Sequence, residues 1–423
     1  MKKKARIVPL LFALCLLVLG LTACGKGGDR GKDFIETPYA GSTLYVYNWG
    51  EYISDGSEGS LDVIREFEKR YGISVRYDYF STNEELYAQL SSGASYDVIF
   101  PSDYMTQRLI DEGMLREINF ASVPNYKDIL PKYRKQYFDP DDKYSVPYTV
   151  GMLGIVYNTK LVDPKDVADR SWDILWNQKY SPSQRINMNN PRDAFGVAML
   201  KEGMDVNTTA KADWDAAYRV LNEQNCIYLM DEIYNKMENG AAAVAAYYAG
   251  DCLVMMQENE DLDFYYPTEG TNIFIDSMCI PKSSKNPGAA ELFINFMLDP
   301  DIATANANYI CYASPSAAVR KHPDYDYSLE NNERYYNYLY TLPESYAENE
   351  ELMQFYKLLD DDTQKLLNSL WARLGVDPGE GGNYVGTYIF LGIVVVLIVG
   401  FTAYSIYDST KKYKRAKRSK RKS

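Results

Sequence analysis

The chain has little of the chemistry on which most hydrolases and metalloenzymes depend. Its 423 residues include one histidine, His322. A Ser-His-Asp triad or a zinc site with several histidines would have to be built around that single residue. His322 precedes a proline in a polar stretch, so we expect it at the surface. The sequence contains neither a Walker A motif nor a dinucleotide-binding fingerprint. We therefore predict no cofactor and no metal site.

Cysteine is also scarce, with six in the chain and no CxxC pattern typical of metal or redox sites. Besides Cys15 and Cys24, the chain has Cys226, Cys252, Cys279 and Cys311. The wide spacing of these four is consistent with two disulfides and at least as consistent with four thiols in apolar surroundings.

The N-terminus has the pattern of an export signal. A basic start is followed by an apolar stretch, Leu10 to Leu21, which is too short for a comfortable membrane span. The segment Leu21-Thr22-Ala23-Cys24 resembles a bacterial lipoprotein signal, which implies cleavage after residue 23 and lipid on Cys24. We predict a lipoprotein signal peptide at 1–23 and a flexible, Gly-rich tether at 24–41. The alternative is an ordinary secretory signal with a chance cysteine.

The C-terminus has the pattern of a membrane anchor. No charged residue occurs from Gly381 to Tyr407, and nine Lys/Arg follow in the last residues. We predict a linker at 376–386, a transmembrane helix at 387–407 and a basic tail at 408–423 that is cytoplasmic by the positive-inside rule. The alternative, a buried core helix, fits poorly with such a tail. The protein is thus expected at a bacterial cell membrane, with its body outside the cytoplasm.

The body between these ends is strongly acidic. Without the Lys/Arg of the leader and of the tail, and without Asp408, the chain keeps 32 basic and 57 acidic residues, a net charge of −25. Such a body is not expected to bind nucleic acid or anionic lipid through its charge, and it attracts cations. High solubility is the plainer explanation of the same charge.

Strand and helix patterns alternate through the body, whose length of about 335 residues predicts two lobes rather than one core. Strands are expected at 43–47, 73–80 and 96–100, helices at 60–71 and 83–91, an extended segment at 145–158, a strand at 273–280 and a helix at 288–298. The first five elements predict a parallel, doubly wound α/β sheet. Ligands bind such sheets at the carboxyl ends of the strands.

Seven stretches of the body form a set, in this order: YNWGEY (47–52), YDVIFPSDYM (96–105), VPYTVG (146–151), NNPRDAFGVAM (189–199), YYAGD (247–251), IFIDSMCIPKSSKNPGAAELFINFML (273–298) and YASPSAA (312–318). Together they resemble the spermidine/putrescine-binding proteins of ABC transporters. The resemblance implies a two-lobed periplasmic-binding-protein fold of type II that closes around its ligand. It places lobe 1 at 42–149 and 272–312, and lobe 2 at 150–271 and 313–375. It also implies no catalytic activity and delivery of ligand to an ABC permease.

A polyamine needs carboxylates for its ammonium groups and aromatic faces for its methylenes. The resemblance carries this role to the following positions: Trp49, Glu51, Tyr52, Ser102, Asp103, Tyr104, Asn190, Asp193, Tyr248, Asp251, Phe274, Asp276 and Tyr312. Three of them depart from the family pattern. Asn190 stands where spermidine-binding members have an aspartate, Asp193 is one methylene shorter than the commoner glutamate, and Tyr248 replaces a common tryptophan. Asp251 offers a compensating carboxylate.

The sequence thus predicts a membrane-tethered receptor for putrescine or spermidine. Three alternatives remain at this point. One is a binding protein for another small cationic or polar solute. The others are an extracellular hydrolase that uses paired carboxylates and a structural envelope protein without a ligand.

Overall fold

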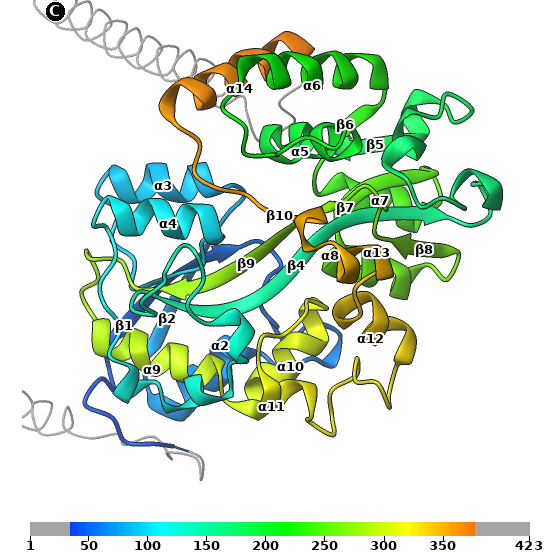
Figure 1. The fold of residues 1–423 in the computed structure, drawn as a ribbon. Helices are drawn as coiled ribbons and strands as arrows, with labels where there is room; N and C mark the ends of the chain where they lie inside the picture. The colour runs from blue at the N-terminus through cyan, green and yellow to red at the C-terminus, as the bar shows by residue number, and fades with distance from the viewer. Residues whose placement is uncertain (1–33, 377–423) are drawn as a thin grey trace, which may run out of the picture. The chain divides into compact units, whose positions relative to one another are not determined.

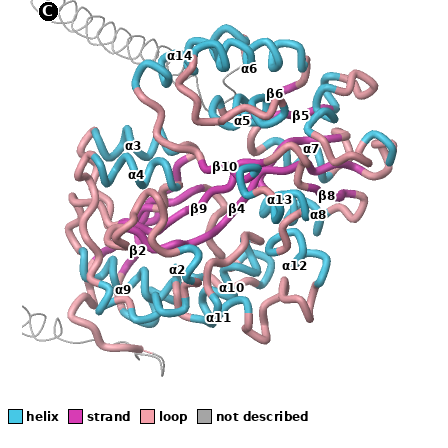
Figure 2. Tube along the Cα trace, in the orientation of Figure 1, coloured by secondary structure: helices cyan, strands magenta, loops and turns pink. Residues whose placement is uncertain are grey.

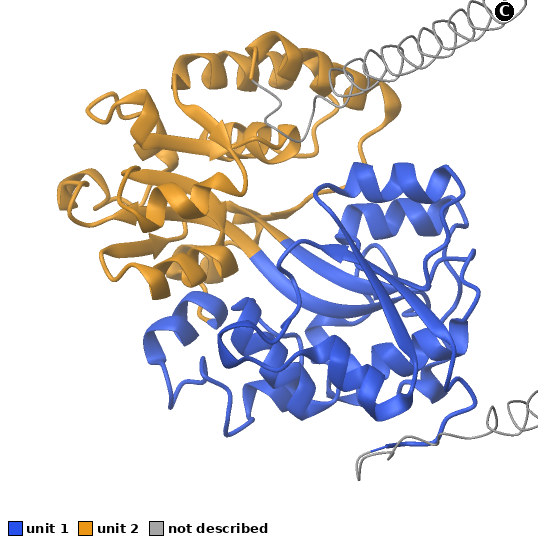
Figure 3. Ribbon diagram, turned by 180° about the vertical axis from the view of Figure 1, so that it is seen from behind, with its two compact units in different colours: residues 1–151, 274–340 blue, residues 152–273, 341–423 orange. Residues whose placement is uncertain are grey.

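The computed structural model describes residues 34–376, which form two compact units (Figure 3). Unit 1 holds residues 34–151 and 274–340, and unit 2 holds residues 152–273 and 341–376. The chain passes from one unit to the other within strand β4 (Ser145–Asn158), within strand β9 (Thr271–Cys279) and after residue 340.

One predicted boundary differs from the structure. The predicted second lobe includes residues 313–340, but the structure groups them with unit 1. The reason lies in backbone pairing: Val150 forms a β-bridge with Ala313, and Ile129 forms another with Ser316. These bridges hold the segment that follows residue 312 against unit 1.

The sheet of unit 1 has the strand order β2-β1-β3-β9. Besides β9, its strands are β1 (Thr43–Trp49), β2 (Ser74–Phe80) and β3 (Val98–Ile99). Strand β1 is parallel to both β2 and β3, as the alternation of strands and helices predicts. Strand β9 is antiparallel to β3, because it enters from unit 2 without a crossover helix. The sheet is therefore mixed rather than wholly parallel.

Helices cover both faces of this sheet. They are α2 (Val63–Tyr71), α3 (Asn83–Ser91), α4 (Asp103–Asp111), α9 (Pro287–Met297), α10 (Pro300–Ile310), α11 (Ala317–Arg320) and α12 (Glu333–Tyr340). Figures 1 and 2 show α3 and α4 on one side and α2 and α9 on the other. Helix α2 begins after Asp62, whose carboxylate accepts the Arg65 N–H at 2.9 Å, and it packs on α9 through Phe67 and Phe293.

The sheet of unit 2 has the strand order β4-β7-β5-β6. Its further strands are β5 (Arg185–Met188), β6 (Ile227–Leu229), β7 (Val244–Tyr248), β8 (Leu262–Tyr265) and β10 (Met353–Phe355). Strand β5 is parallel to β6 and β7, whereas β4 is antiparallel to β7 and to β8. Strand β10 pairs in parallel with the first residues of β9.

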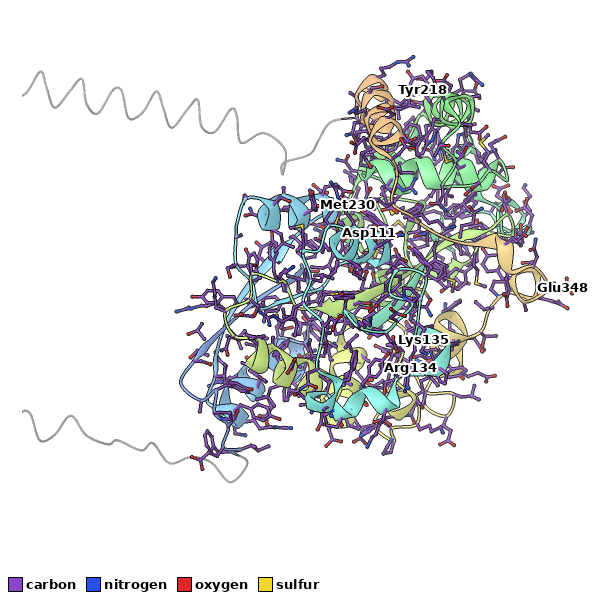
Figure 4. The ribbon with its side chains drawn as sticks, turned by 60° about the vertical axis from the view of Figure 1, so that its left-hand side comes forward. Asp111, Arg134, Lys135, Tyr218, Met230 and Glu348 are labelled. Atoms are coloured by element: carbon purple, nitrogen blue, oxygen red, sulfur yellow. The ribbon has the colours of Figure 1, made fainter. Side chains whose placement is uncertain are left out.

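The helices of unit 2 are α5 (Pro191–Lys201), α6 (Lys211–Gln224), α7 (Glu232–Glu238), α8 (Ala249–Glu258), α13 (Glu344–Glu348) and α14 (Asp361–Leu374). Helix α14 packs on α6, the helix that carries Tyr218 (Figure 4). The guanidinium of Arg373 on α14 lies 4.5 Å from the ring centre of Tyr218. This contact fixes the end of the described chain to unit 2.

The remaining predictions from the sequence concern the two membrane anchors, the cysteines and His322. The predicted signal peptide with Cys24, the transmembrane helix at 387–407 and the basic tail lie outside residues 34–376. Within residues 34–376, no helix combines the length and apolarity needed to cross a bilayer. Cys226, Cys252, Cys279 and Cys311 form no disulfide, so they are thiols. His322 is half-buried, with Nε2 3.0 Å from a carboxylate oxygen of Asp301.

Candidate functional site

Asp276 is the central carboxylate of unit 1. It lies on β9 and is 4% exposed. The hydroxyl of Tyr52 donates a hydrogen bond of 2.8 Å to its Oδ2 and also contacts the hydroxyl of Thr149. The other oxygen, Oδ1, is buried and makes no hydrogen bond of standard geometry with residues 34–376. A buried carboxylate oxygen without a donor is costly, so this position suits a ligand that brings one.

The surroundings of Asp276 contain hydroxyl groups but no paired cation. Burial raises the pKa of Asp276 to about 6, while hydrogen bonds from Ser102, Tyr52 and Thr149 act in the opposite direction. Burial and the charge of Asp276 raise the pKa of Tyr52 well above its ordinary value, so the phenol stays a donor. No basic side chain of the described residues forms an ion pair with Asp276. An arriving cation would therefore be the counter-ion.

Aromatic rings gather around Tyr52, the donor to this carboxylate. The ring of Tyr52 meets those of Tyr148 and Tyr312 edge-on, with centres 5.5 Å and 5.0 Å apart. Phe274 lies two residues before Asp276 on the same face of β9, and its ring centre is 6.4 Å from that of Tyr312. Phe274 also covers Gly151, where an added Cβ would lie 2.2 Å from the ring. The glycine thus leaves the space that the ring occupies.

The residues at the ends of β1 and β3 are held by main-chain contacts. The indole of Trp49 donates to the carbonyl of Phe100 at 2.8 Å. Glu51 is exposed and has a positive φ of 52°. Asp103 is 1% exposed, and its two oxygens accept the N–H groups of Tyr104 at 2.7 Å and Ile275 at 3.4 Å. Asp103 therefore ties the start of α4 to β9.

Two further residues of that region contact α3. The N–H of Ser102 donates to Oδ1 of Asn83 at 3.1 Å, and the hydroxyl of Tyr104 donates to Glu84 at 3.1 Å. Ser102 also provides one of the hydroxyls that lower the pKa of Asp276. The structure thus brings Ser102 to the carboxylate of Asp276, whereas the hydroxyl of Tyr104 donates to an exposed glutamate.

Unit 2 presents two carboxylates in a common arrangement. Asp193 is the third residue of α5, and its Oδ2 accepts from the Tyr248 hydroxyl at 2.6 Å. Asp251 is the third residue of α8, and its Oδ1 accepts from the Tyr234 hydroxyl at 2.6 Å. Each carboxylate therefore has the positive end of a helix dipole behind it and a phenol beside it, and both features favour its ionised form.

Asn190 caps the helix that carries Asp193. Its side-chain oxygen accepts the N–H groups of Arg192 at 3.0 Å and Asp193 at 3.4 Å. Because the oxygen faces these donors, the amide nitrogen is the group that remains to face other partners. At this position the chain thus offers a neutral amide donor and no charge.

The predicted residues gather in two places, one in each unit. Tyr52, Phe274, Asp276 and Tyr312 meet in unit 1. In unit 2, Asn190, Asp193 and Tyr248 are joined by hydrogen bonds, and the rings of Tyr248, Tyr247 and Tyr234 continue to Asp251 with centres 5.2 Å and 6.0 Å apart. The sequence interpretation missed Thr149, Tyr148 and Tyr234 as partners. Thr149 and Tyr148 lie within the VPYTVG stretch that it singled out.

The sequence model of one family, described as bacterial extracellular solute-binding protein, matches residues 90–340. The chain belongs to this family. Within it, the spermidine/putrescine-binding branch suggested by the seven stretches is confirmed by the curated relatives. The spermidine/putrescine-binding periplasmic protein of Escherichia coli K12 is 32% identical over 72% of this chain and 85% of its own length. The putrescine-binding periplasmic protein PotF of the same organism is 28% identical over 66% of this chain and 82% of its own length.

A solved structure is similar to this solute-binding protein as well. It is the spermidine/putrescine ABC transporter substrate-binding protein PotD of Streptococcus pneumoniae, in complex with calcium and HEPES, with 29% identity and a TM-score of 0.65 over 79% of this chain and 98% of that chain. The predicted two-domain α/β periplasmic-binding-protein fold is confirmed. The relatives are substrate-binding transport proteins, so the protein is not an enzyme, and the hydrolase alternative is wrong.

Proposed function

We propose that this solute-binding protein captures putrescine or spermidine outside the cytoplasm and delivers it to an ABC permease. The observation that carries the proposal is Asp276, a buried carboxylate with one oxygen that accepts no hydrogen bond of standard geometry from residues 34–376 and with aromatic rings packed on its donor Tyr52. An ammonium group supplies both the missing donors and the missing charge. The aromatic faces suit the adjoining methylenes and add cation–π attraction of ~0.5–2 kcal/mol each.

The two carboxylates of unit 2 support the same proposal. Asp193 and Asp251 each have one oxygen bonded to a tyrosine, and each lies at the start of a helix. A diamine or triamine needs more than one anionic partner. We also propose that the protein closes on its ligand before delivery, as the family implies. Two relatives are named as spermidine/putrescine-binding and putrescine-binding proteins, which adds support.

A second candidate is another small cationic or polar solute. The neutral Asn190 favours it, because its side-chain oxygen is used by the cap of α5 and its amide nitrogen can only donate, whereas an ammonium group needs an acceptor. Calorimetric titration separates the two candidates: binding of putrescine or spermidine supports the first, and binding of another solute alone supports the second.

Membrane attachment completes the proposal. A lipid on Cys24, a transmembrane helix at 387–407 and a cytoplasmic basic tail would keep the receptor close to its permease and raise the effective concentration. The support is the sequence pattern alone. Metabolic labelling with a fatty acid, compared between the parent and Cys24→Ser, tests the lipid anchor.

Calorimetric titration of the full chain with putrescine, spermidine, arginine and thiamine tests the ligand. We expect binding of at least one polyamine, and its loss in Asp276→Asn. Asp97→Asn is the matched control in unit 1, since Asp97 is also buried but accepts hydrogen bonds from Tyr45, Ser284, Lys285 and Asn286. A parent that binds neither polyamine would overturn the proposal.

A further inference from the structure

Asn306 holds the loop that carries Tyr52, although it lies on α10, far along the chain from that loop. It is 3% exposed. Its Oδ1 accepts the N–H of Ser54 at 2.9 Å, and its Nδ2 donates to the hydroxyl of Tyr148 at 2.8 Å. The Tyr148 hydroxyl in turn donates to the carbonyl of Tyr52 at 2.7 Å. The amide of Asn306 thus holds the loop backbone directly at Ser54 and, through the Tyr148 hydroxyl, at Tyr52.

The hydrogen-bond directions in this network are fixed by chemistry. The N–H of Ser54 can only donate, so the amide oxygen of Asn306 must face it and the NH₂ group must face Tyr148. Tyr148 then accepts from Asn306 and has its own hydrogen left for the carbonyl of Tyr52. The arrangement has one consistent orientation, and an apolar residue at 306 would remove two of its bonds.

The loop matters because Tyr52 is the residue that donates to Asp276. The phenol contacts Thr149 on one side and donates to Oδ2 of Asp276 on the other. Such a bond requires the ring to be placed within a few tenths of an ångström. The ring is attached to the same backbone segment that Asn306 and Tyr148 hold.

We propose that Asn306 is a positioning residue of the ligand site, which acts through Tyr148 and the Tyr52 backbone to aim the Tyr52 phenol at Asp276. Asn306 makes its hydrogen bonds with Ser54 and Tyr148 rather than with Asp276, and these bonds are present in the free protein. The consequence for ligand affinity rests on the proposed function.

The groups that face Asp276 define what a change at Asn306 can alter. The hydroxyls of Tyr52, Ser102 and Thr149 act on its carboxylate directly, and Tyr148 interacts with it electrostatically. Next to them, Tyr312 packs on the ring of Tyr52, and Asp103 accepts the N–H of Ile275, the residue before Asp276. Among these neighbours Asp103 is the one carboxyl group, and backbone N–H groups donate to both of its oxygens. A misplaced Tyr52 therefore removes a donor that lowers the pKa of Asp276 and leaves the desolvation unchanged.

The test compares Asn306→Leu with the parent in the full chain labelled with ¹³C at aspartate carboxyls. The Asp276 signal is identified by its loss in Asp276→Asn. We expect the titration midpoint of Asp276 to rise by about one pH unit in Asn306→Leu. At pH 6 the ionised share then falls from about half to about a tenth, so putrescine binds about fivefold more weakly. Tyr148→Phe keeps the ring and should shift the midpoint in the same direction.

Thr304→Ala is the matched control. Thr304 lies on the same helix, is 2% exposed, and its hydroxyl makes no hydrogen bond with the described residues. It should lower stability without moving the midpoint. An unchanged midpoint in Asn306→Leu, or an equal shift in Thr304→Ala, would overturn the inference. A parent that binds no polyamine would refute the proposed function instead, because the titration of the free protein still decides the role of Asn306.

Discussion

The phenol of Tyr248 donates a hydrogen bond of 2.6 Å to Oδ2 of Asp193. Tyr248 is the residue before α8, and Asp193 is the third residue of α5, so the bond joins the starts of two helices. Burial and the neighbouring carboxylate raise the pKa of Tyr248 well above its ordinary value. The tyrosine therefore remains the donor at every physiological pH and sets the orientation of the carboxylate.

Tyr248→Phe should weaken putrescine binding about tenfold, because a charge-assisted hydrogen bond that orients Asp193 is lost while the aromatic face remains. Calorimetry at pH 7.5 measures the change. Tyr265→Phe is the control: Tyr265 is 5% exposed in the same unit, and its hydroxyl donates to the carbonyl of Ser171 at 2.9 Å. Equal affinities of Tyr248→Phe and the parent would show that Asp193 needs no such orientation.

Gly151→Ala should displace the ring of Phe274, because the new Cβ would lie 2.2 Å from it. Overpacking of this kind costs about 1–3 kcal/mol of stability. We expect ligand affinity to fall as well, since Phe274 lies beside Asp276 on β9. Gly154→Ala is the matched control in unit 2, because its new Cβ would clash with Phe264 at the same distance of 2.2 Å. Calorimetry and thermal unfolding of both variants decide the matter: similar losses of affinity would contradict a specific role for Phe274.

The sequence predicted best those elements whose signals are local. Strand β4 occupies 145–158 as expected, because a nearly unbroken apolar run has polar residues on both sides. Helix α3 also begins where expected, since Thr82 accepts the N–H of Glu85 at its start. Strand β9 was found, but its antiparallel pairing with β3 was not, because strand direction depends on the path of the chain through unit 2.

The candidate site was predicted unevenly for a similar reason. Asp276 and Asp193 belong to stretches with a family-like pattern. Which residues pair with them can be recognised only in three dimensions. Tyr52 contacts Asp276, which lies 224 residues later in the sequence, and Thr149, which lies 97 residues later. No periodicity or motif reports such a pairing. Asn306 gave no signal at all, since a buried asparagine within a helix looks like any other polar residue there.

Asn190→Asp should raise affinity for spermidine more than for putrescine. The aspartate keeps the helix cap, since a carboxylate accepts the same N–H groups, and it adds a charge for a further ammonium group. We expect a gain of about tenfold for spermidine by calorimetry. Asn349→Asp, at the cap of a short helical turn in the same unit, controls for total charge. A loss of spermidine affinity in Asn190→Asp would refute this reading of Asn190.

Ligand binding and stability should respond to pH in opposite directions at Asp276. Burial raises the pKa of Asp276 from an ordinary 3.8 to about 6, so the folded protein takes up this proton more readily than the unfolded chain. Stability from this group is then fully present below pH 4 and is lost as pH rises through about 6. The difference corresponds to about 3 kcal/mol at pH 7.5. A cationic ligand needs the ionised form, so its affinity should fall as pH drops below about 6.

Asp276→Asn should therefore separate the two effects. It removes the cost of a buried charge, so we expect it to be more stable than the parent at pH 7.5, by up to about 3 kcal/mol, and no more stable at pH 4. Denaturant unfolding across this pH range measures the difference. Asp97→Asn should lose stability at pH 7.5, because three backbone N–H groups would then face an amide. If Asp276→Asn also lost stability at pH 7.5, then Asp276 would be a structural carboxylate, held by Tyr52 for the fold rather than kept ready for a cation.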